Sequence, residues 1–516
     1  MSRTFDVIVC GAGHNGLVAA SLLARRGLSV LVVEEKSEVG GACKTERPFA
    51  RAPELRTSTG AYLLGLMPPE LIATLGIELP LRRRDPHYFL PTTTNRYLLF
   101  GSDRAAMREQ FLSFFSQADW RANEALETEI ASLREDVAPT WLAEPLSIEA
   151  TADRYVRPAL RETFVDLCRG SVGAYLDRFG FRSDLVKAMY AVTDGLSGLN
   201  GSWDSPGSGM NFLVHNLCRL PGADGTWMIV EGGMGTVTQR LADAARRAGA
   251  TIECGTKVER ILHSHGIAEG VLTESADDIR ARVVVVNADP FRMQQMIGRS
   301  SLTPDYNTMV DGLRKPGSTL KVNLALRGLP RFRCLAEDRG QYGPTIHLLP
   351  DEDGVLATLA HGFSEVQAGR LASFPAIEWY IHTTVDPSLR DADGNHNSAL
   401  FVQSVPYELS DSTWEIEEER YTRHLLSLCD RFAPGTSDLV VDTFVLHPKK
   451  IESHFGITGG HIHHVDNGFG FADRLPYATP IAGVYSCSAG THPAGSVIGA
   501  AGHNSAQRVL ADLGLR

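Results

Sequence analysis

Gly11-Ala-Gly-His-Asn-Gly16 directly follows the apolar run Phe5-Asp-Val-Ile-Val-Cys10 near the start of this sequence. The apolar run predicts a short buried strand. Residues 17–26 place their apolar side chains at helical spacing, and residues 28–33 predict a second strand. A strand, a glycine-rich turn, a helix and a second strand in this order predict the start of a Rossmann-type α/β domain.

The three glycines of this turn predict a site for a dinucleotide. Gly11 allows the tight turn, Gly13 lets the backbone approach a pyrophosphate, and Gly16 lets the helix pack closely on the strand. The N-terminus of the helix adds N–H donors and positive potential. Ala12 and Asn15 belong to the same turn, so all five residues are expected in the cofactor site.

Two glutamates follow the second predicted strand. Glu34 can accept hydrogen bonds from both hydroxyls of an adenosine ribose, and its charge disfavours the 2′-phosphate of NADP. Glu35 comes next and is included in the expected cofactor site. These residues alone leave both FAD and NAD open.

A second glycine doublet follows the second strand, in Ser37-Glu-Val-Gly40-Gly41-Ala-Cys-Lys-Thr45. It resembles the glycine-doublet flavoproteins, a superfamily that includes the amine oxidases and the phytoene desaturases. The resemblance implies that the cofactor is FAD and that Gly40, Gly41 and Ala42 lie against its pyrophosphate. Many members carry arginine where this chain has Ala42, so an ionic clamp is not expected there.

The C-terminal region resembles one branch of that superfamily. Residues 481–488 predict a strand, and after it come Ala489-Gly490-Thr-His-Pro493-Ala-Gly495-Ser-Val-Ile-Gly499-Ala-Ala-Gly502 and a helix ending near residue 511. This signature resembles the phytoene desaturase branch. With the N-terminal motif, it is most similar to the group of pyridine nucleotide-disulfide oxidoreductase domain-containing protein 2 and to the bacterial carotene ketolases of desaturase type. The resemblance implies that four residues of this loop lie beside the flavin: Gly490, Thr491, Gly495 and Val497.

The middle of the chain adds two expected cofactor contacts. Lys257-Val-Glu-Arg-Ile261 begins a strand, and the resemblance implies that Val258 holds the adenine through its backbone. Val283-Val-Val-Val-Asn-Ala-Asp289 resembles the family strand that passes beside FAD, and it includes Asn287. The glycines of Gly232-Gly-Met-Gly235 lack the G-x-G-x-x-G spacing, so they predict a substrate-side turn. The sequence therefore predicts one dinucleotide site and no NAD(P) domain.

The expected fold class is α/β, with a Rossmann-type FAD-binding domain built from discontinuous segments. Residues 105–170 predict helices and residues 317–327 alternate as a strand does, so the inserted substrate domain combines a mixed sheet with helices. The FAD-binding domain is expected to comprise residues 1–69, 222–299 and 446–516, and the substrate-binding domain residues 70–221 and 300–445.

Four side chains are candidates for the chemistry. Lys321 interrupts its predicted strand; in amine oxidases a comparable lysine binds a water at flavin N5, and the alternative is a solvent-facing lysine. His492 is either a packing residue by the flavin or a general base. His461 and His463 stand two apart in a predicted strand, where they would line the substrate cavity; otherwise they are ordinary loop histidines, and no metal site is expected. By contrast, Arg82-Arg-Arg84 predicts a solvated turn.

Composition limits the partners of the protein. Its 516 residues include 50 Lys and Arg against 61 Asp and Glu, and a net charge of −11 gives no overall attraction for nucleic acid. The eight cysteines show no C-x-x-C pattern, so neither a zinc site nor a dithiol centre is expected.

The sequence shows no secretory leader and no run of about 18 apolar residues, which predicts a cytoplasmic protein. The apolar residues 61–76 predict either a core loop and helix or a surface that contacts a membrane peripherally, in mitochondria if the source is eukaryotic. The oligomeric state stays open.

The predicted function is that of an FAD-dependent dehydrogenase or desaturase. It passes a hydride to flavin N5 from a hydrophobic substrate, a polyene or isoprenoid by resemblance, and oxygen or a quinone reoxidises it. Three alternatives stay open: an amine or alcohol oxidase of a smaller substrate, a flavin-dependent cis–trans isomerase, and a non-catalytic carrier like the GDP dissociation inhibitors.

Overall fold

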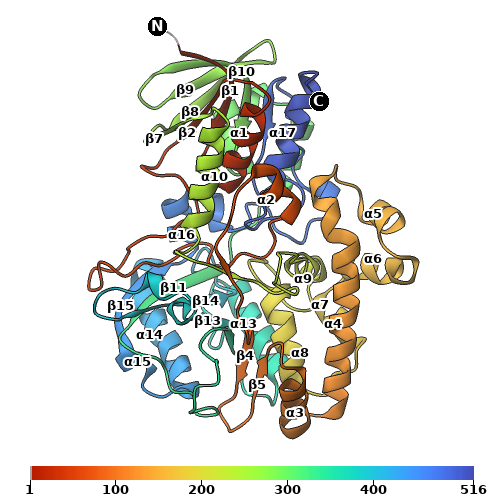
Figure 1. Ribbon diagram of the computed structural model, residues 1–516, viewed down its shortest axis with the longest axis vertical. Helices are drawn as coiled ribbons and strands as arrows, with labels where there is room; N and C mark the ends of the chain where they lie inside the picture. Colours follow the sequence, from red (N-terminus) through yellow and green to blue (C-terminus); the bar gives the residue numbers. More distant parts are fainter. Residues whose placement is uncertain (1–2, 516) are drawn as a thin grey trace.

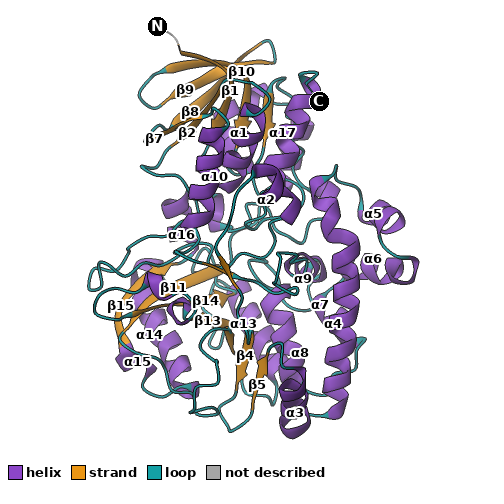
Figure 2. Ribbon diagram, viewed as in Figure 1, coloured by secondary structure: helices purple, strands orange, loops and turns teal. Residues whose placement is uncertain are grey.

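Two seven-stranded sheets organise the molecule, one toward each end of its longest axis (Figures 1 and 2). The computed structural model describes residues 3–515. The chain passes between the two parts several times, so each sheet combines strands that are far apart in the sequence.

The first sheet has the parallel core expected of a Rossmann-type domain. The pairs that join its first four strands are parallel, and the last two strands continue it as an antiparallel hairpin. In spatial order the strands are β7 (Thr251–Cys254), β2 (Val30–Glu34), β1 (Arg3–Cys10), β10 (Asp278–Val286), β9 (Ile267–Thr273) and β8 (Val258–Ser264). A short strand, β16 (Val484–Ser486), pairs in parallel with the last three residues of β10.

Helices cover both faces of this sheet. Val7 and Val9 of β1 point to one face, and Ile8 and Cys10 point to the other, and all four side chains are buried. The first face is covered by α1 (His14–Ala24), α10 (Gly235–Arg247) and α17 (Ala500–Asp512), and the second by α11 (Pro290–Ile297) and α12 (Pro304–Gly312).

The apolar residues 61–76 form a loop and a helix, α2 (Pro69–Leu75), beside α1. Their large apolar side chains are buried in the core on that face of the sheet: Leu64, Met67, Leu71 and Leu75. The prediction of a core loop and helix is therefore confirmed for these side chains. Peripheral membrane contact stays a prediction. Over residues 3–515, no helix has the length and the apolar character needed to cross a membrane.

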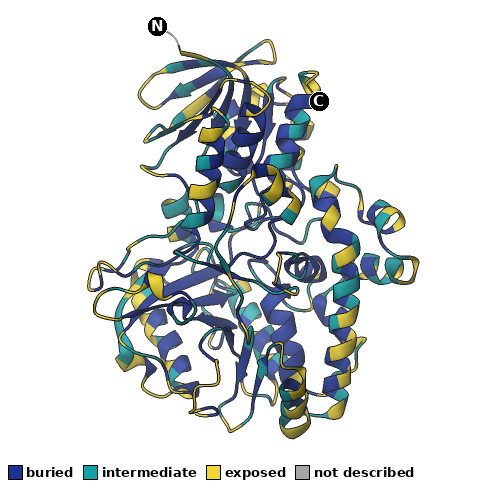
Figure 3. Cartoon of the chain, in the orientation of Figure 1, coloured by how far each residue is buried: buried dark blue, intermediate teal, exposed yellow. Residues whose placement is uncertain are grey.

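The second sheet is mixed. In spatial order its strands are β15 (Val440–Leu446), β11 (Thr319–Leu326), β14 (His396–Gln403), β13 (Ile377–Tyr380), β12 (Thr345–Leu348), β4 (Tyr88–Pro91) and β5 (Tyr97–Phe100), and only β12 and β4 pair in parallel. Every residue of β11 and β14 is buried (Figure 3). A helix, α14 (Trp414–Phe432), covers one face of these strands, and the opposite face lines the cavity described below.

Helices also fill the space beside the second sheet, as predicted for residues 105–170 (Figure 2). They are α3 (Arg104–Phe114), α4 (Gln117–Val137), α5 (Ile148–Tyr155), α6 (Arg161–Arg169), α7 (Val172–Asp177), α8 (Asp184–Tyr190) and α9 (Ser208–His215). The remaining longer elements are α13 (Val355–Gln367), α15 (Thr436–Leu439), α16 (Pro448–Phe455) and the two-stranded sheet of β3 (Leu81–Arg82) and β6 (Ile229–Val230).

The strand predicted for residues 481–488 is shorter in the structure. Only Val484–Ser486 form β16, because a turn closes just before it. Gly483 has φ +85, and the Val484 N–H donates to the carbonyl of Ile481 at 3.0 Å.

Candidate active site

A cavity of about 310 Å³ reaches from the first sheet to the second. At one end it is lined by the turn between β1 and α1 and by the residues after β10. These are carboxyl ends of parallel strands, where nucleotides bind in open α/β sheets. At the other end it is lined by the face of the second sheet that α14 leaves free. The cavity thus joins the predicted cofactor residues to the inserted sheet.

The turn between β1 and α1 forms one wall at the first end. Gly11 has φ +101, which favours glycine, and a Cβ at Gly13 would lie 2.8 Å from Asn287 Nδ2, so the Asn287 side chain would have to move. No side chain caps α1, which leaves its first N–H groups free to bind an anion. Gly11, Gly13, Asn15 and Asn287 line the cavity, whereas Gly16 packs α1 onto β1.

Glu34 stands in the next wall, at the end of β2. Its buried carboxylate accepts the backbone N–H groups of Ala12 at 2.7 Å and Lys36 at 2.9 Å. These bonds fix the carboxylate, which lines the cavity together with Val258. The neighbouring Glu35 also lines it and pairs with an arginine of α11 at 3.1 Å.

The second glycine doublet rests on the first motif. Gly40 donates its N–H to the Ala12 carbonyl at 3.0 Å, and a Cβ at Gly41 would lie 3.6 Å from Gly13 Cα. Gly40, Gly41 and Ala42 line the same end of the cavity. Two glycine loops, a helix N-terminus and a fixed carboxylate therefore converge, and they fit the adenosine diphosphate half of FAD.

The C-terminal loop contributes less to the cavity wall than expected. Val497 lines the cavity with Ser496. The other three expected contacts lie behind the wall, where they pack against neighbouring segments: Gly490, Thr491 and Gly495.

His492 does not line the cavity either. Its buried ring lies edge-on to Phe471, with 5.5 Å between the ring centroids. Burial lowers the pKa of His492 to about 3, so the ring is neutral at physiological pH. This position favours the packing alternative for His492 over the general base.

Lys321 points from β11 into the cavity and is only 3 % exposed. Its Nζ donates to the carbonyls of Ser58 at 2.6 Å and Gly60 at 2.8 Å, and it lies 4.5 Å from the centre of the Tyr62 ring. Burial lowers the pKa of Lys321 well below its usual value. The solvent-facing alternative for this lysine is therefore wrong.

Arg84 lines the end of the cavity beside the second sheet, which is called the inner end below. Its side chain is buried, and the residue is 2 % exposed. Its Nε donates to the Trp227 carbonyl at 3.1 Å and its Nη1 to Thr345 Oγ1 at 2.7 Å. The prediction of a solvated turn is wrong in part: Arg82 and Arg83 pair with carboxylates near the surface, but Arg82 belongs to β3, and Arg84 is buried. After β3 the chain places the Arg84 side chain against the second sheet, where it donates to Thr345 of β12.

Two buried carboxyl groups share this inner end. Glu378 accepts from Gln403 Nε2 at 3.2 Å and from the Tyr380 hydroxyl, and burial raises its pKa to about 8. Asp194 accepts from Asn216 Nδ2 at 3.0 Å, and burial raises its pKa to about 7. The sequence gives no signal for either residue, because a strand carrying Glu378 and Tyr380 two apart is typical of a solvent-facing strand.

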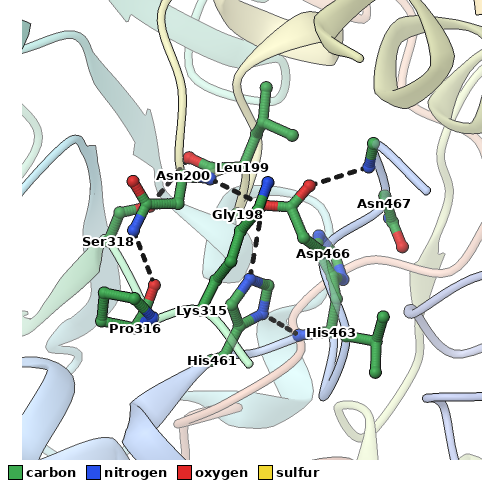
Figure 4. A network of polar contacts seen from close by, with 12 residues as sticks. Gly198, Leu199, Asn200, Lys315, Pro316, Ser318, His461, His463, Asp466 and Asn467 are labelled. Atoms are coloured by element: carbon green, nitrogen blue, oxygen red, sulfur yellow. Dashed lines mark hydrogen bonds and ion pairs between the residues drawn. The ribbon is translucent and has the colours of Figure 1, made fainter. Parts of the chain in front are cut away.

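The two candidate histidines lie in a turn rather than a strand (Figure 4). The strand prediction is wrong because the His464 N–H donates back to the His461 carbonyl at 2.8 Å. Buried Asp466 fixes this turn: it lies 3.6 Å from His461 Nε2 and 3.5 Å from Lys315 Nζ. His463 lines the cavity and contacts the Ser197 carbonyl at 3.0 Å, whereas His461 lies behind it.

Comparison with known proteins shows the family of this chain. The family model described as flavin containing amine oxidoreductase matches residues 16–352. The chain is 32% identical over 554 aligned residues to pyridine nucleotide-disulfide oxidoreductase domain-containing protein 2 of Mus musculus, covering 99% of this chain and 94% of that one. This confirms the expected resemblance to that group.

More distant matches extend the comparison. A zeta-carotene-forming phytoene desaturase of Myxococcus xanthus is 27% identical, over 92% of this chain and 86% of its own. The structure of putrescine oxidase bound to putrescine superposes with a TM-score of 0.62 at 18% identity, covering 100% of both chains, which establishes a common fold. The chain therefore belongs to the flavin containing amine oxidoreductase family, with FAD as its cofactor and the α/β fold of the FAD-dependent amine oxidases.

Proposed function

We propose that this FAD-dependent oxidoreductase oxidises a small polar substrate, an amine or an alcohol, at the inner end of the cavity. The observation that carries the proposal is the buried cluster of Lys321, Glu378 and Tyr380 on the cavity face of the second sheet. An amine or alcohol offers these side chains a polar atom to bind, whereas a hydrocarbon offers none.

The oxidation removes a hydride and a proton from the substrate. FAD, when bound, would supply the acceptor for the hydride of the C–H bond next to the nitrogen or oxygen. The N–H or O–H proton passes to the protein, and a C=N or C=O bond forms. Ionised Glu378 is the proposed acceptor of this proton. The hydroxyls of Tyr380 and Tyr62, 3.1 Å apart, link its carboxyl group to the cavity.

Lys321 is the proposed water-holding residue at the reacting centre. The two carbonyls occupy two of the three positions around the Lys321 nitrogen, and the third, an N–H when the group is protonated and a lone pair when it is neutral, is left for a water. A water held there is suited to assist reoxidation by oxygen, the step that a comparable lysine serves in amine oxidases.

A second candidate function is the oxidation of a hydrophobic substrate. Part of the cavity wall is apolar and carries Leu63, Trp227, Phe401 and Ile462. Two similar proteins are a phytoene desaturase and a component of the limonene dehydrogenase of Castellaniella defragrans. A polyene or another isoprenoid would use this wall, and its electrons would pass to a quinone.

Anaerobic reduction of the purified holoenzyme distinguishes these candidates. We expect primary amines or alcohols to bleach the visible flavin absorption and air to restore it. Bleaching by isoprenoids alone, with reoxidation by a quinone instead of air, would favour the second candidate. A purified protein that takes up no flavin even with added FAD would contradict both.

A further inference from the structure

A buried amide, that of Gln403, joins Glu378 to another part of the cavity wall. Gln403 is the last residue of β14 and is 1 % exposed. Its Nε2 donates to Glu378 Oε1 at 3.2 Å, and its Oε1 accepts the Gly198 N–H at 3.3 Å. An amide turned by 180° would set its NH₂ group against that N–H, so two donors would face each other. The Gly198 N–H therefore makes the amide present a donor to Glu378.

The backbone at Gly198 is itself held in place. Gly198 has φ +68, a conformation that favours glycine. The segment before it leaves a π-helical turn, Ala191–Gly195, and packs against the buried side chain of Asn211. Three carbonyl oxygens of this segment lie 3.1 Å from Asn211 Nδ2: those of Asp194, Gly195 and Ser197. Gln403 is thus oriented by a fixed part of the backbone.

The groups around Glu378 act on its carboxyl group in opposite directions. Burial raises the pKa of Glu378 to about 8; the charge of Asp194 also raises it, and the charge of Arg84 lowers it. The ionisable hydroxyls near the carboxyl group are those of Tyr62, Tyr88 and Tyr380. The Gln403 amide and the Tyr380 hydroxyl donate hydrogen bonds to it, and both bonds stabilise the carboxylate. Of these two donors only the amide cannot ionise, so it offers the same N–H at every pH.

We infer that Gln403 is a positioning residue, which holds the carboxyl group of Glu378 in one direction and favours its carboxylate form. The inference rests on the proposed function, because Glu378 is the proton acceptor proposed there. A base must be ionised before it can accept the substrate proton. Loss of the amide would remove one of the two donors that stabilise the carboxylate, so Glu378 would ionise at a higher pH.

Infrared titration of the oxidised holoenzyme tests the inference without turnover, over about pH 6 to 10. The measured signal is the carbonyl stretching band of protonated Glu378, which is identified by its loss in Glu378→Gln. We expect a midpoint at about 8 in the unchanged protein. In Gln403→Leu the midpoint should rise by about one pH unit or more, the equivalent of one hydrogen bond to a charged group.

Two further variants make this test specific. Gln403→Glu keeps an oxygen for the Gly198 N–H but sets a second carboxyl group against Glu378, so the pair should keep a proton to a still higher pH. This variant decides if Gln403→Leu does not fold. Gln367→Leu is the matched control, because Gln367 is exposed at the end of α13, and its midpoint should not change. Gln403 variants with the midpoint of this control would overturn the inference.

The pH dependence of flavin reduction separates this inference from the proposed function. If both hold, the rate and the infrared band shift together in Gln403→Leu, while FAD content stays normal. A band that moves while the rate profile stays would support the role of Gln403 and contradict Glu378 as the proton acceptor. A rate profile that moves while the band stays would overturn the inference about Gln403.

Discussion

The side-chain nitrogen of Lys321 is buried, and within residues 3–515 its hydrogen-bond acceptors are two backbone carbonyls. Its replacement by methionine keeps an unbranched side chain, one atom shorter, and removes every N–H donor. We expect Lys321→Met to retain FAD and to be reoxidised by air about 10²-fold more slowly, in the range found for positioned proton-handling groups. Stopped-flow mixing of the reduced enzyme with oxygen measures this rate.

Lys449→Met serves as the control, because Lys449 is exposed and pairs with Glu408 on the surface. Equal reoxidation rates for the two variants would show that Lys321 has a structural role only.

Glu378 links catalysis to pH. Burial raises its pKa to about 8, so its carboxylate form appears as the pH rises through that value. We expect the rate of flavin reduction by substrate to rise from pH 7 to pH 9. Glu378→Gln cannot ionise and should lose this rise, while Glu337→Gln, an exposed control, should keep it. A rise that persists in Glu378→Gln would assign it to Asp194 or Lys321 instead.

The protonation of Glu378 also makes the stability of the folded state depend on pH. The folded state holds the proton of Glu378 more tightly than the unfolded state does, because the folded pKa is the higher one. This contribution is therefore fully present below pH 4.5, the ordinary pKa of the group, and is lost progressively as the pH rises from there through about 8.

The residues at the cofactor end of the cavity could be predicted from the sequence better than those at its inner end. Gly11, Gly13 and Glu34 act through a local motif, which a sequence displays directly. Arg84 and Glu378 meet only because distant strands pack together, and each looks like an ordinary surface residue among its sequence neighbours. No local pattern distinguishes such residues from solvent-facing ones.

At the scale of elements, close packing of α1 on β1 depends on Gly16. A Cβ at this position would lie 2.2 Å from the Gly11 carbonyl oxygen. We expect Gly16→Ala to destabilise the fold by about 1–3 kcal/mol, the usual cost of overpacking, and to lower FAD content. Thermal unfolding and the flavin-to-protein absorbance ratio measure both effects.

Gly312→Ala provides the matched control. Its Cβ would meet no atom within 4 Å, and its φ is not positive, so we expect neither stability nor FAD content to fall. A Gly16→Ala protein that behaves like this control would refute the close-packing argument.

Element boundaries show where sequence patterns reach their limit. The strands of residues 5–10 and 317–327 are predicted well, the first from its apolar run and the second from its alternation. The alternation of His461 and His463 resembles a strand but belongs to a turn. There the buried carboxylate of Asp466 and a backbone bond decide the structure, and neither follows from hydrophobic spacing.

At the scale of the molecule, the segments that are proposed to hold FAD come from three parts of the chain. A ligand that binds only the folded state stabilises it by about 2.7 kcal/mol at 100 times its Kd. We expect the melting temperature of the apoprotein to rise on adding FAD, and adenosine diphosphate to give a smaller rise because it fills only the Glu34 end. Differential scanning fluorimetry measures both shifts, and equal shifts would mean that the inner cavity does not hold the flavin.

The discontinuous order of the first sheet also affects how the protein is made. β1 pairs with β10, β10 pairs with β16, and α1 packs against α17. A ribosome adds about 5–20 residues per second, so β16 and α17 are synthesised on the order of a minute after β1. During that time the apolar side chains of β1 and α1 are available to chaperones, and a transcript truncated before codon 484 would yield a chain unable to complete its cofactor domain.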